Sequence, residues 1–160
     1  MVPIKGIEIL LDAFEALSRN HDSLRLFIVG DKETDYGREM EGRAMQSPYS
    51  ARIHFTGKVK NVSDYYSIAD VFVMTSKKES CPVALLEAMA CGLPVLASDI
   101  PGNREILEPF SDFLFPLDSK FTLVDKLLLM LFKNEICNPL FFACLLIHFL
   151  LWCIQPGFSD

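Results

Sequence analysis

Short, wholly apolar runs recur along this chain and alternate with amphipathic or polar stretches. The clearest runs are residues 26–29, 71–74 and 94–97. Apolar side chains at successive positions are typical of strands that are buried on both faces of a parallel sheet. Strands that alternate with helices predict βαβ units. The sequence therefore predicts an α/β fold, a doubly wound parallel sheet whose ligands bind beyond the carboxyl ends of the strands.

The helices between these runs are predicted from the spacing of apolar residues. Ile7, Leu11 and Phe14 fall on one face of a helix expected over residues 7–17. The other elements predicted from composition are helices at 36–46, 104–107 and 121–132 and strands at 53–55 and 113–115.

Capping residues mark two further helices. Asn61 is expected to cap a short helix, and Asp64 in its first turn favours the positive helix end. Pro82 opens a second helix that reaches Met89, and Gly92 supplies its stop.

The distribution of charge divides the chain into two segments. Every charged residue except Asp160 lies in residues 1–135, which are expected to form the folded domain. Residues 136–160 form an apolar tail that His148 interrupts. A membrane anchor, a packed C-terminal helix and a segment without a folded role all fit this tail, since a spanning helix needs ~20 apolar residues. The expected location is the cytoplasm, with membrane contact through residues 136–154 left open.

Composition excludes other classes of protein. The net charge of -6 argues against nucleic-acid binding, which requires a basic surface. Five cysteines without metal-binding spacing are typical of a reduced, cytosolic protein. No signal peptide is expected, because Met1 is not followed by a basic patch and an apolar run.

Two glutamates carry the strongest indication of chemistry. Glu79 lies in the predicted loop after a buried strand, and Glu87 lies about one and a half turns into the helix opened by Pro82. The Glu87 carboxylate can accept hydrogen bonds from vicinal hydroxyls such as those of a ribose. The amides of Val83 and Ala84 are expected to face a diphosphate at the positive helix end.

The stretch from Thr75 to Ser98 resembles the nucleotide-sugar domain of the glycosyl transferases group 1, a family of retaining GT-B glycosyltransferases. The two glutamates are separated by seven residues, and the run from Ala88 to Val95, which reads AMACGLPV, follows them as in the family. The likeness extends from Lys5 to about residue 117. It implies a Rossmann-like, C-terminal half of a GT-B fold.

The resemblance implies roles for residues of this stretch. Glu79 would bind the donor sugar, Glu87 the ribose, and the helix start the diphosphate. Ser80 and Cys81 would belong to the loop that binds the donor, although the family often has Gly-Phe-Gly where this chain has Ser80, Cys81 and Pro82. Pro82 has no N–H group, so one amide contact is lost or moved to Val83. No histidine adjoins Cys81 to activate it, so its thiol is read as part of a small loop residue.

The resemblance also reaches other loops. Lys5 matches the family's phosphate-binding lysine and would neutralise the leaving diphosphate, although an ordinary surface lysine also fits. Lys58 and Val59 would contact the nucleobase through their backbone. Gly30 would allow close backbone approach, and Gly102 would lie near the sugar, although each glycine equally fits a simple turn.

The family resemblance implies the donor domain of a glycosyltransferase. Such an enzyme transfers a hexose from a nucleoside diphosphate sugar to an acceptor hydroxyl with retention, without metal or cofactor. The acceptor-binding domain and the first, Arg-bearing strand of the sheet would precede Met1, which leaves two neighbouring strands with unpaired backbone. The alternative is a non-catalytic nucleotide-sugar-binding subunit or an inactive fragment that needs a partner chain.

Overall fold

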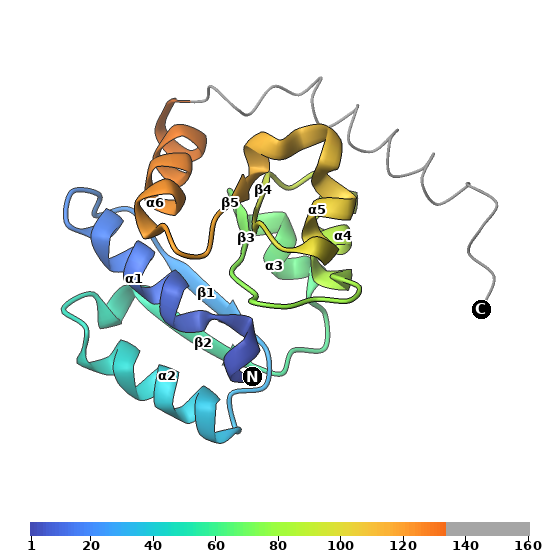
Figure 1. Ribbon diagram of the computed structural model, residues 1–160. Coiled ribbons are helices and arrows are strands. Elements are labelled where there is room, and N and C mark those ends of the chain that lie inside the picture. The colour runs from blue at the N-terminus through green and yellow to red at the C-terminus, as the bar shows by residue number, and fades with distance from the viewer. Residues whose placement is uncertain (134–160) are drawn as a thin grey trace.

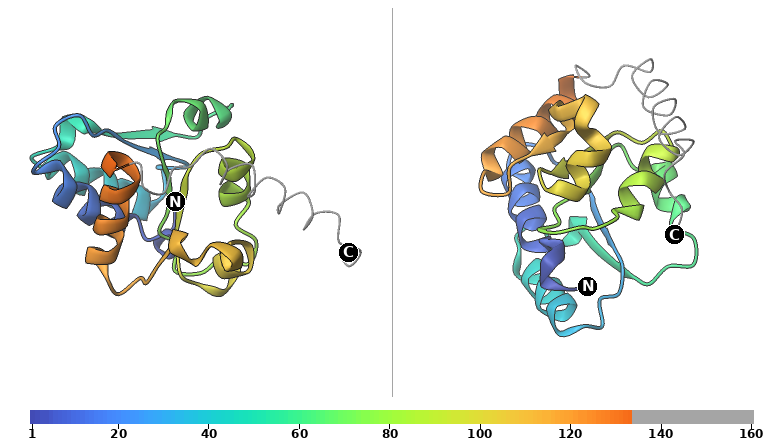
Figure 2. Two further views of the ribbon diagram at one scale, coloured as in Figure 1. Left: turned by 90° about the horizontal axis from the view of Figure 1, so that it is seen from above. Right: turned by 45° about the vertical axis from the view of Figure 1, so that its right-hand side comes forward.

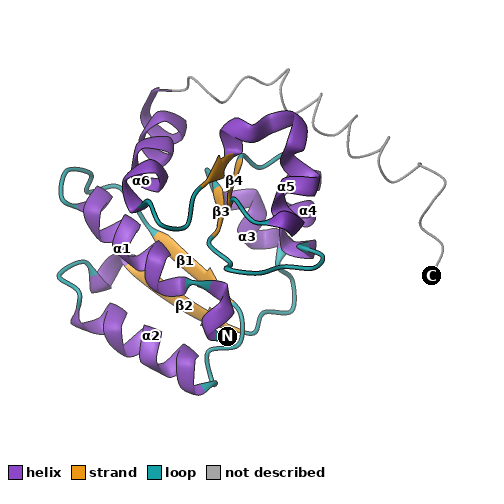
Figure 3. Cartoon of the chain, viewed as in Figure 1, coloured by secondary structure: helices purple, strands orange, loops and turns teal. Residues whose placement is uncertain are grey.

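The computed structural model describes residues 1–133, in which short parallel strands alternate with helices (Figures 1 and 3). One group pairs β1 (Leu26–Val29) with β2 (Ile53–Gly57). The other group has the order β3 (Phe72–Met74), β4 (Val95–Ser98) and β5 (Leu114–Phe115). The predicted α/β class with parallel strands is confirmed. Within the described range, β4 pairs with two neighbours, and the other four strands each pair on one side only.

The helices have well-defined bounds. They are α1 (Ile7–Ser18), α2 (Asp35–Gln46), α3 (Ser63–Ile68), α4 (Val83–Ala90), α5 (Pro101–Leu107) and α6 (Lys120–Leu128). Short 3-10 turns lie at Pro3–Lys5, Ser50–Arg52 and Glu108–Phe113, and a π-helical turn lies at Leu129–Lys133. Figure 2 shows α1 and α2 beside the β1–β2 group and α4 and α5 beside the β3–β5 group.

Helix α1 connects the two hydrophobic clusters of the molecule. Ala13 and Leu17 belong to the larger cluster around β3, β4 and β5. Leu11 and Phe14 belong to the smaller cluster beneath β1 and β2. The predicted apolar stripe of residues 7–17 therefore contacts two cores, because residues on two adjacent sides of the helix pack against different strand groups.

Three details of the predicted helices are wrong. Asn61 does not cap α3: its side-chain amide donates to Asp64 Oδ1 over 2.7 Å, and Val62 is the residue that precedes the helix. Helix α5 begins at Pro101 rather than residue 104, since proline is well suited to the first helical position. The helix expected over residues 121–132 changes to a π-helical turn after Leu128.

The predicted apolar tail of residues 136–160 lies outside the described residues. Within residues 1–133, no helix has both the length and the apolar character that a membrane span requires.

Candidate functional site

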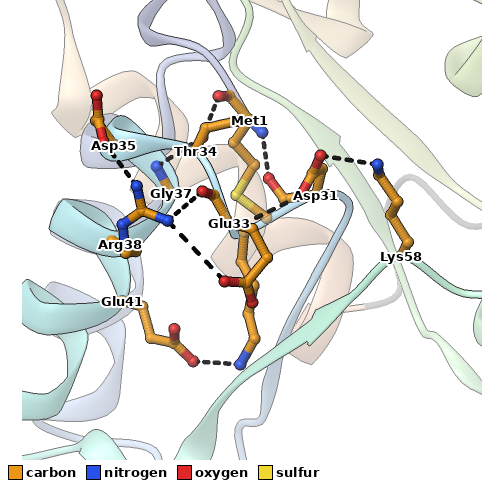
Figure 4. A network of polar contacts seen from close by, with 10 residues as sticks. Met1, Asp31, Glu33, Thr34, Asp35, Gly37, Arg38, Glu41 and Lys58 are labelled. Carbon is orange, nitrogen blue, oxygen red and sulfur yellow. Dashed lines mark hydrogen bonds and ion pairs between the residues drawn. The ribbon is translucent and has the colours of Figure 1, made fainter.

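The first residues of the chain lie across the carboxyl ends of both strand groups. The Met1 backbone nitrogen donates to the carbonyl of Asp31, just after β1 (Figure 4). The carbonyl of Ile4 accepts a 2.7 Å hydrogen bond from the amide of Lys77, which follows β3. Because ligands of doubly wound sheets bind at this edge, these contacts place the N-terminal segment at the expected site.

Lys5 and Glu79 meet at this edge. The Lys5 ammonium lies 2.6 Å from Glu79 Oε1, and the Glu79 side chain is 12% exposed while that of Lys5 is 45% exposed. The Thr75 hydroxyl holds the Lys5 carbonyl at 3.0 Å. Gly6 follows with a φ of 62°, and a Cβ at this position would collide with the Thr75 carbonyl oxygen. A glycine is thus required at position 6, because a larger residue there would push Lys5 away from the loop that carries Glu79.

A buried polar network supports the loop that precedes Glu79. The Ser98 hydroxyl, at the end of β4, donates to the Ser76 carbonyl over 2.5 Å. The Asn103 amide, on α5, donates to the Ser98 carbonyl over 2.9 Å. All three residues are buried. These hydrogen bonds connect the turn after β3 to β4 and α5. They therefore restrain the backbone that precedes Glu79.

Gly102 contacts the backbone of Glu79 rather than lining a loop. It is the second residue of α5 and is buried, and a Cβ there would collide with the Glu79 carbonyl oxygen. The reading of Gly102 as a simple turn residue is therefore wrong. Its lack of a side chain lets α5 approach the Glu79 loop closely.

The start of α4 differs in part from the expected diphosphate site. The Val83 amide donates to the Cys81 carbonyl over 2.9 Å, so it is not free to face a ligand as predicted. The Ala84 amide has no hydrogen-bond acceptor within residues 1–133. Ser80 and Cys81 are exposed in the preceding loop. This bond closes a tight turn centred on Pro82, whose backbone angles, φ -81° and ψ 71°, are those of an inverse γ-turn, so the turn occupies the Val83 amide.

Glu87 is exposed on α4, and its carboxylate contacts a tyrosine of α3. Tyr66 donates toward Glu87 Oε2 at 3.2 Å and toward the Ala84 carbonyl at 3.3 Å. Burial of the ring and the nearby Glu87 charge raise the pKa of Tyr66 to about 12. Sequence reasoning missed Tyr66, because nothing in the spacing of Tyr66 and Glu87 signals a contact between two helices.

The loops after β1 and β2 meet through an ion pair. Lys58 Nζ lies 3.0 Å from Asp31 Oδ2, and this hydrogen bond lowers the pKa of Asp31 (Figure 4). Gly30 has a φ of 142°, a backbone conformation that favours glycine, while Val59 is half-buried. No ion pair or side-chain hydrogen bond within the described part of the chain joins this pair directly to Glu79 or Glu87.

A second cluster behind Lys5 was also missed. Lys77 Nζ lies 2.5 Å from Glu8 Oε1, and the Tyr36 hydroxyl donates to the other oxygen of Glu8. Burial acts to raise the pKa of Glu8, but the hydrogen bonds from Lys77 and Tyr36 outweigh it and hold the pKa below its ordinary value. The cluster joins the start of α1 to α2 and to the loop after β3. The sequence shows that Glu8 and Lys77 carry opposite charges, but it does not show that these two side chains are in contact.

Metal ligands do not gather at this edge. Among residues 1–133, no group of three or more His, Cys, Asp or Glu side chains could hold a metal ion. The expectation that nucleotide binding needs no metal stays a prediction.

Comparison with known proteins places these residues in a wider context. The family model described as "Glycosyl transferases group 1" matches residues 1–139. The capsular polysaccharide biosynthesis glycosyltransferase CapH of Staphylococcus aureus is 32% identical over 68% of this chain and 31% of its own length. The phosphatidyl-myo-inositol mannosyltransferase of Mycobacterium leprae is 30% identical over 88% of this chain and 37% of its own. This chain thus spans about a third of the length of these curated relatives.

A solved structure supports the architecture. The Anabaena protein HepE, crystallised with UDP and glucose, matches 93% of this chain and 41% of its own with a TM-score of 0.78 at 22% identity. Likeness at this identity concerns the fold, and it confirms the predicted Rossmann-like half of a GT-B architecture.

Proposed function

Because this chain belongs to the glycosyl transferases group 1 family, we propose that it forms the nucleotide-sugar-binding domain of a retaining glycosyltransferase. The reaction moves a hexose from a nucleoside diphosphate sugar to an acceptor hydroxyl. The resemblance in the sequence to this family is confirmed by the match over residues 1–139.

The observation that carries the proposal is the Lys5–Glu79 ion pair at the carboxyl end of β3. The ammonium of Lys5 binds the diphosphate and stabilises the charge that develops as it leaves. The Ala84 amide, at the start of α4, donates to the same group. The Glu79 carboxylate accepts a hydrogen bond from a hydroxyl of the sugar, and Glu87 accepts from the ribose.

Sugar transfer requires one bond to form as another breaks. The acceptor oxygen bonds to the anomeric carbon, and the bond from that carbon to the diphosphate oxygen breaks. Retention brings the acceptor to the face that the diphosphate leaves, so the departing phosphate oxygen takes up the hydroxyl proton. Lys5 holds the departing phosphate in place for this step.

Uridine diphosphate is the probe of choice, because the HepE structure was solved with UDP and glucose. Isothermal titration of the whole chain with UDP is expected to give saturable binding that UDP-glucose competes away. Lys5→Met should weaken this binding, whereas Lys78→Met, at an exposed lysine of the loop that carries Glu79, should not. A chain that binds neither UDP nor another nucleoside diphosphate contradicts the proposal.

The alternative function is nucleotide-sugar binding without catalysis, in a subunit or fragment that a partner chain completes. It is favoured by the length of the match, about a third of the curated relatives. Orientation of donor and acceptor in one closed site can supply ~7–11 kcal/mol of the barrier, so the donor side alone forfeits most of it. We expect the isolated chain to transfer no glucose from UDP-glucose and at most to hydrolyse it slowly. Mass spectrometry of a glycosylated acceptor would overturn this alternative.

A further inference from the structure

Tyr66 is a buried tyrosine whose hydroxyl reaches a carboxylate that is otherwise exposed. The residue is 8% exposed, and its ring packs edge-on against Phe72 with 5.9 Å between centroids. The hydroxyl lies 3.2 Å from Glu87 Oε2. Within residues 1–133, the Glu87 carboxylate has no other hydrogen bond and no ion pair. Tyr66 is therefore the group that restrains Glu87 in the described structure.

The Tyr66 hydroxyl makes a second contact on α4, with a backbone carbonyl close to Glu87. The hydroxyl also lies 3.3 Å from the carbonyl of Ala84, one turn before Glu87 on the same helix. A tyrosine has one proton to donate, and both acceptors lie on the face of α4 that meets α3. The Tyr66 hydroxyl therefore shares its proton between these two acceptors, which places the Glu87 carboxylate beside the Ala84 carbonyl at the start of α4.

The geometry leaves the carboxylate able to bind a ligand. Two carboxylate oxygens offer about four acceptor positions, and Tyr66 uses one of them. The raised pKa of Tyr66, about 12, keeps its hydroxyl protonated and donating at any ordinary pH. Because the Tyr66 hydroxyl contacts only one oxygen of the Glu87 carboxylate, the remaining acceptor positions of that carboxylate are available to two neighbouring hydroxyls of a ligand.

We propose that Tyr66 is a positioning residue that holds Glu87 for the vicinal hydroxyls of a ribose, and so sets the preference of this site for ribonucleotides over deoxyribonucleotides. The inference rests on the proposed binding of ribose by Glu87. An exposed glutamate without this anchor would sample several rotamers and meet both hydroxyls only part of the time. The preference for the 2′-hydroxyl therefore depends on a residue that does not touch the nucleotide.

The test compares UDP with 2′-deoxy-UDP by isothermal titration of the whole chain. Tyr66→Phe keeps the ring and removes the hydroxyl. It should weaken UDP binding about two- to tenfold, the range of one net hydrogen bond, and 2′-deoxy-UDP binding less. The ratio of the two affinities should fall. A merely structural tyrosine would change both affinities alike, and an unchanged ratio overturns the proposal.

Two further variants sharpen the result. Tyr65→Phe is the matched control on α3, because the Tyr65 ring lies beside Phe27 rather than Glu87, and it should leave the ratio unchanged. Glu87→Asp retains the charge but shortens the side chain away from Tyr66, so it should also lower the ratio. It provides an independent readout if Tyr66→Phe does not fold, and a retained ratio in Glu87→Asp counts against the proposal.

A variant of Glu87 separates this inference from the proposed function. Glu87→Ala should weaken UDP binding, and Tyr66→Phe should then have little additional effect, because the restrained group is gone. If Glu87→Ala leaves the UDP affinity unchanged, the ribose assignment fails and this inference fails with it. If Glu87→Ala weakens UDP but Tyr66→Phe leaves the ratio intact, the positioning role alone is wrong.

Discussion

The Lys5 ammonium and the Glu79 carboxylate form a 2.6 Å ion pair although they lie 74 positions apart in the chain. The pair brings together a cation proposed to bind the diphosphate and an acid proposed to bind the sugar. In the described structure each neutralises the other. A bound diphosphate would compete with Glu79 for the Lys5 charge, so this contact is the first to test.

Replacing Lys5 should weaken UDP binding much more than it lowers the stability of the fold. Lys5→Met should reduce UDP affinity by about 1.5–3 kcal/mol, the range for hydrogen bonds to charged groups. The unfolding free energy should change by less than about 1 kcal/mol, because the Lys5 side chain is 45% exposed and ion pairs in contact with solvent contribute little. Titration calorimetry and urea denaturation give the two values. Equal affinity in Lys5→Met and the unaltered chain would remove Lys5 from the site.

Glu87→Gln keeps the shape of the side chain and removes its charge. UDP binding should weaken by about 1.5–3 kcal/mol, because the hydroxyl hydrogen bonds lose their charged acceptor. Glu105→Gln, on α5, is a suitable control because Glu105 is also an exposed helical glutamate. If the two variants bind UDP equally well, Glu87 does not contact the nucleotide.

Nucleotide binding is expected to survive removal of divalent cations. Lys5 and the α4 start supply the positive potential that a diphosphate needs, so no bridging ion is required. UDP affinity measured in EDTA should match that in MgCl₂ at equal ionic strength. Loss of binding in EDTA would show that a cation holds the diphosphate instead.

Gly102→Ala should destabilise the fold and disturb the Glu79 loop. Its Cβ would collide with the Glu79 carbonyl oxygen, and such overpacking typically costs about 1–3 kcal/mol. Gly42→Ala is the matched control: Gly42 lies inside α2 with open space around it and should stabilise the chain by about 0.5–1 kcal/mol. Thermal denaturation followed by circular dichroism tests both the expected loss of stability in Gly102→Ala and the expected gain in Gly42→Ala. A Gly102→Ala variant as stable as Gly42→Ala contradicts the close approach of α5.

The Glu8 cluster should make stability depend on pH in the acid range. The pKa of Glu8 in the folded chain lies below its ordinary value of 4.5, so the folded state favours the charged form. This contribution is complete above the ordinary pKa and is lost as pH falls through the lowered one. Urea denaturation between about pH 6 and 3 measures how the free energy of unfolding falls with pH. This fall should be shallower for Glu8→Gln than for the unaltered chain. Glu15→Gln, elsewhere on α1, should retain the full decline.

Local patterns were enough to predict much of the fold. Helix α1 was predicted from its apolar spacing, and β1, β3 and β4 were predicted from uninterrupted apolar runs. These elements follow from burial of side chains that neighbour one another along the chain. The cap of α3 was mispredicted because Asn61 bonds the Asp64 side chain instead of the backbone. Such a choice between two nearby partners is not fixed by residue type.

The candidate site was predicted less completely, because its contacts cross between elements. Lys5 and Glu79 were both singled out, but their direct contact depends on the path of the chain over β3. The Val83 amide was expected to be free, and a tight turn to Cys81 occupies it. Tyr66 gave no signal because its partner, Glu87, lies on another helix. Long-range packing, rather than local sequence, decides each of these contacts.

Helix α1 contributes buried side chains to both hydrophobic clusters, whereas the two strand groups share no strand pairing within residues 1–133. Lys5 precedes this helix by two residues, but the Thr75 hydroxyl and the Lys77 amide bind the backbone of Lys5 and Ile4, so the lysine is anchored to the loop after β3 that also carries Glu79. Local opening of the smaller cluster beside β1 and β2 is therefore expected to leave the ion pair intact until the β3–β5 group itself unfolds.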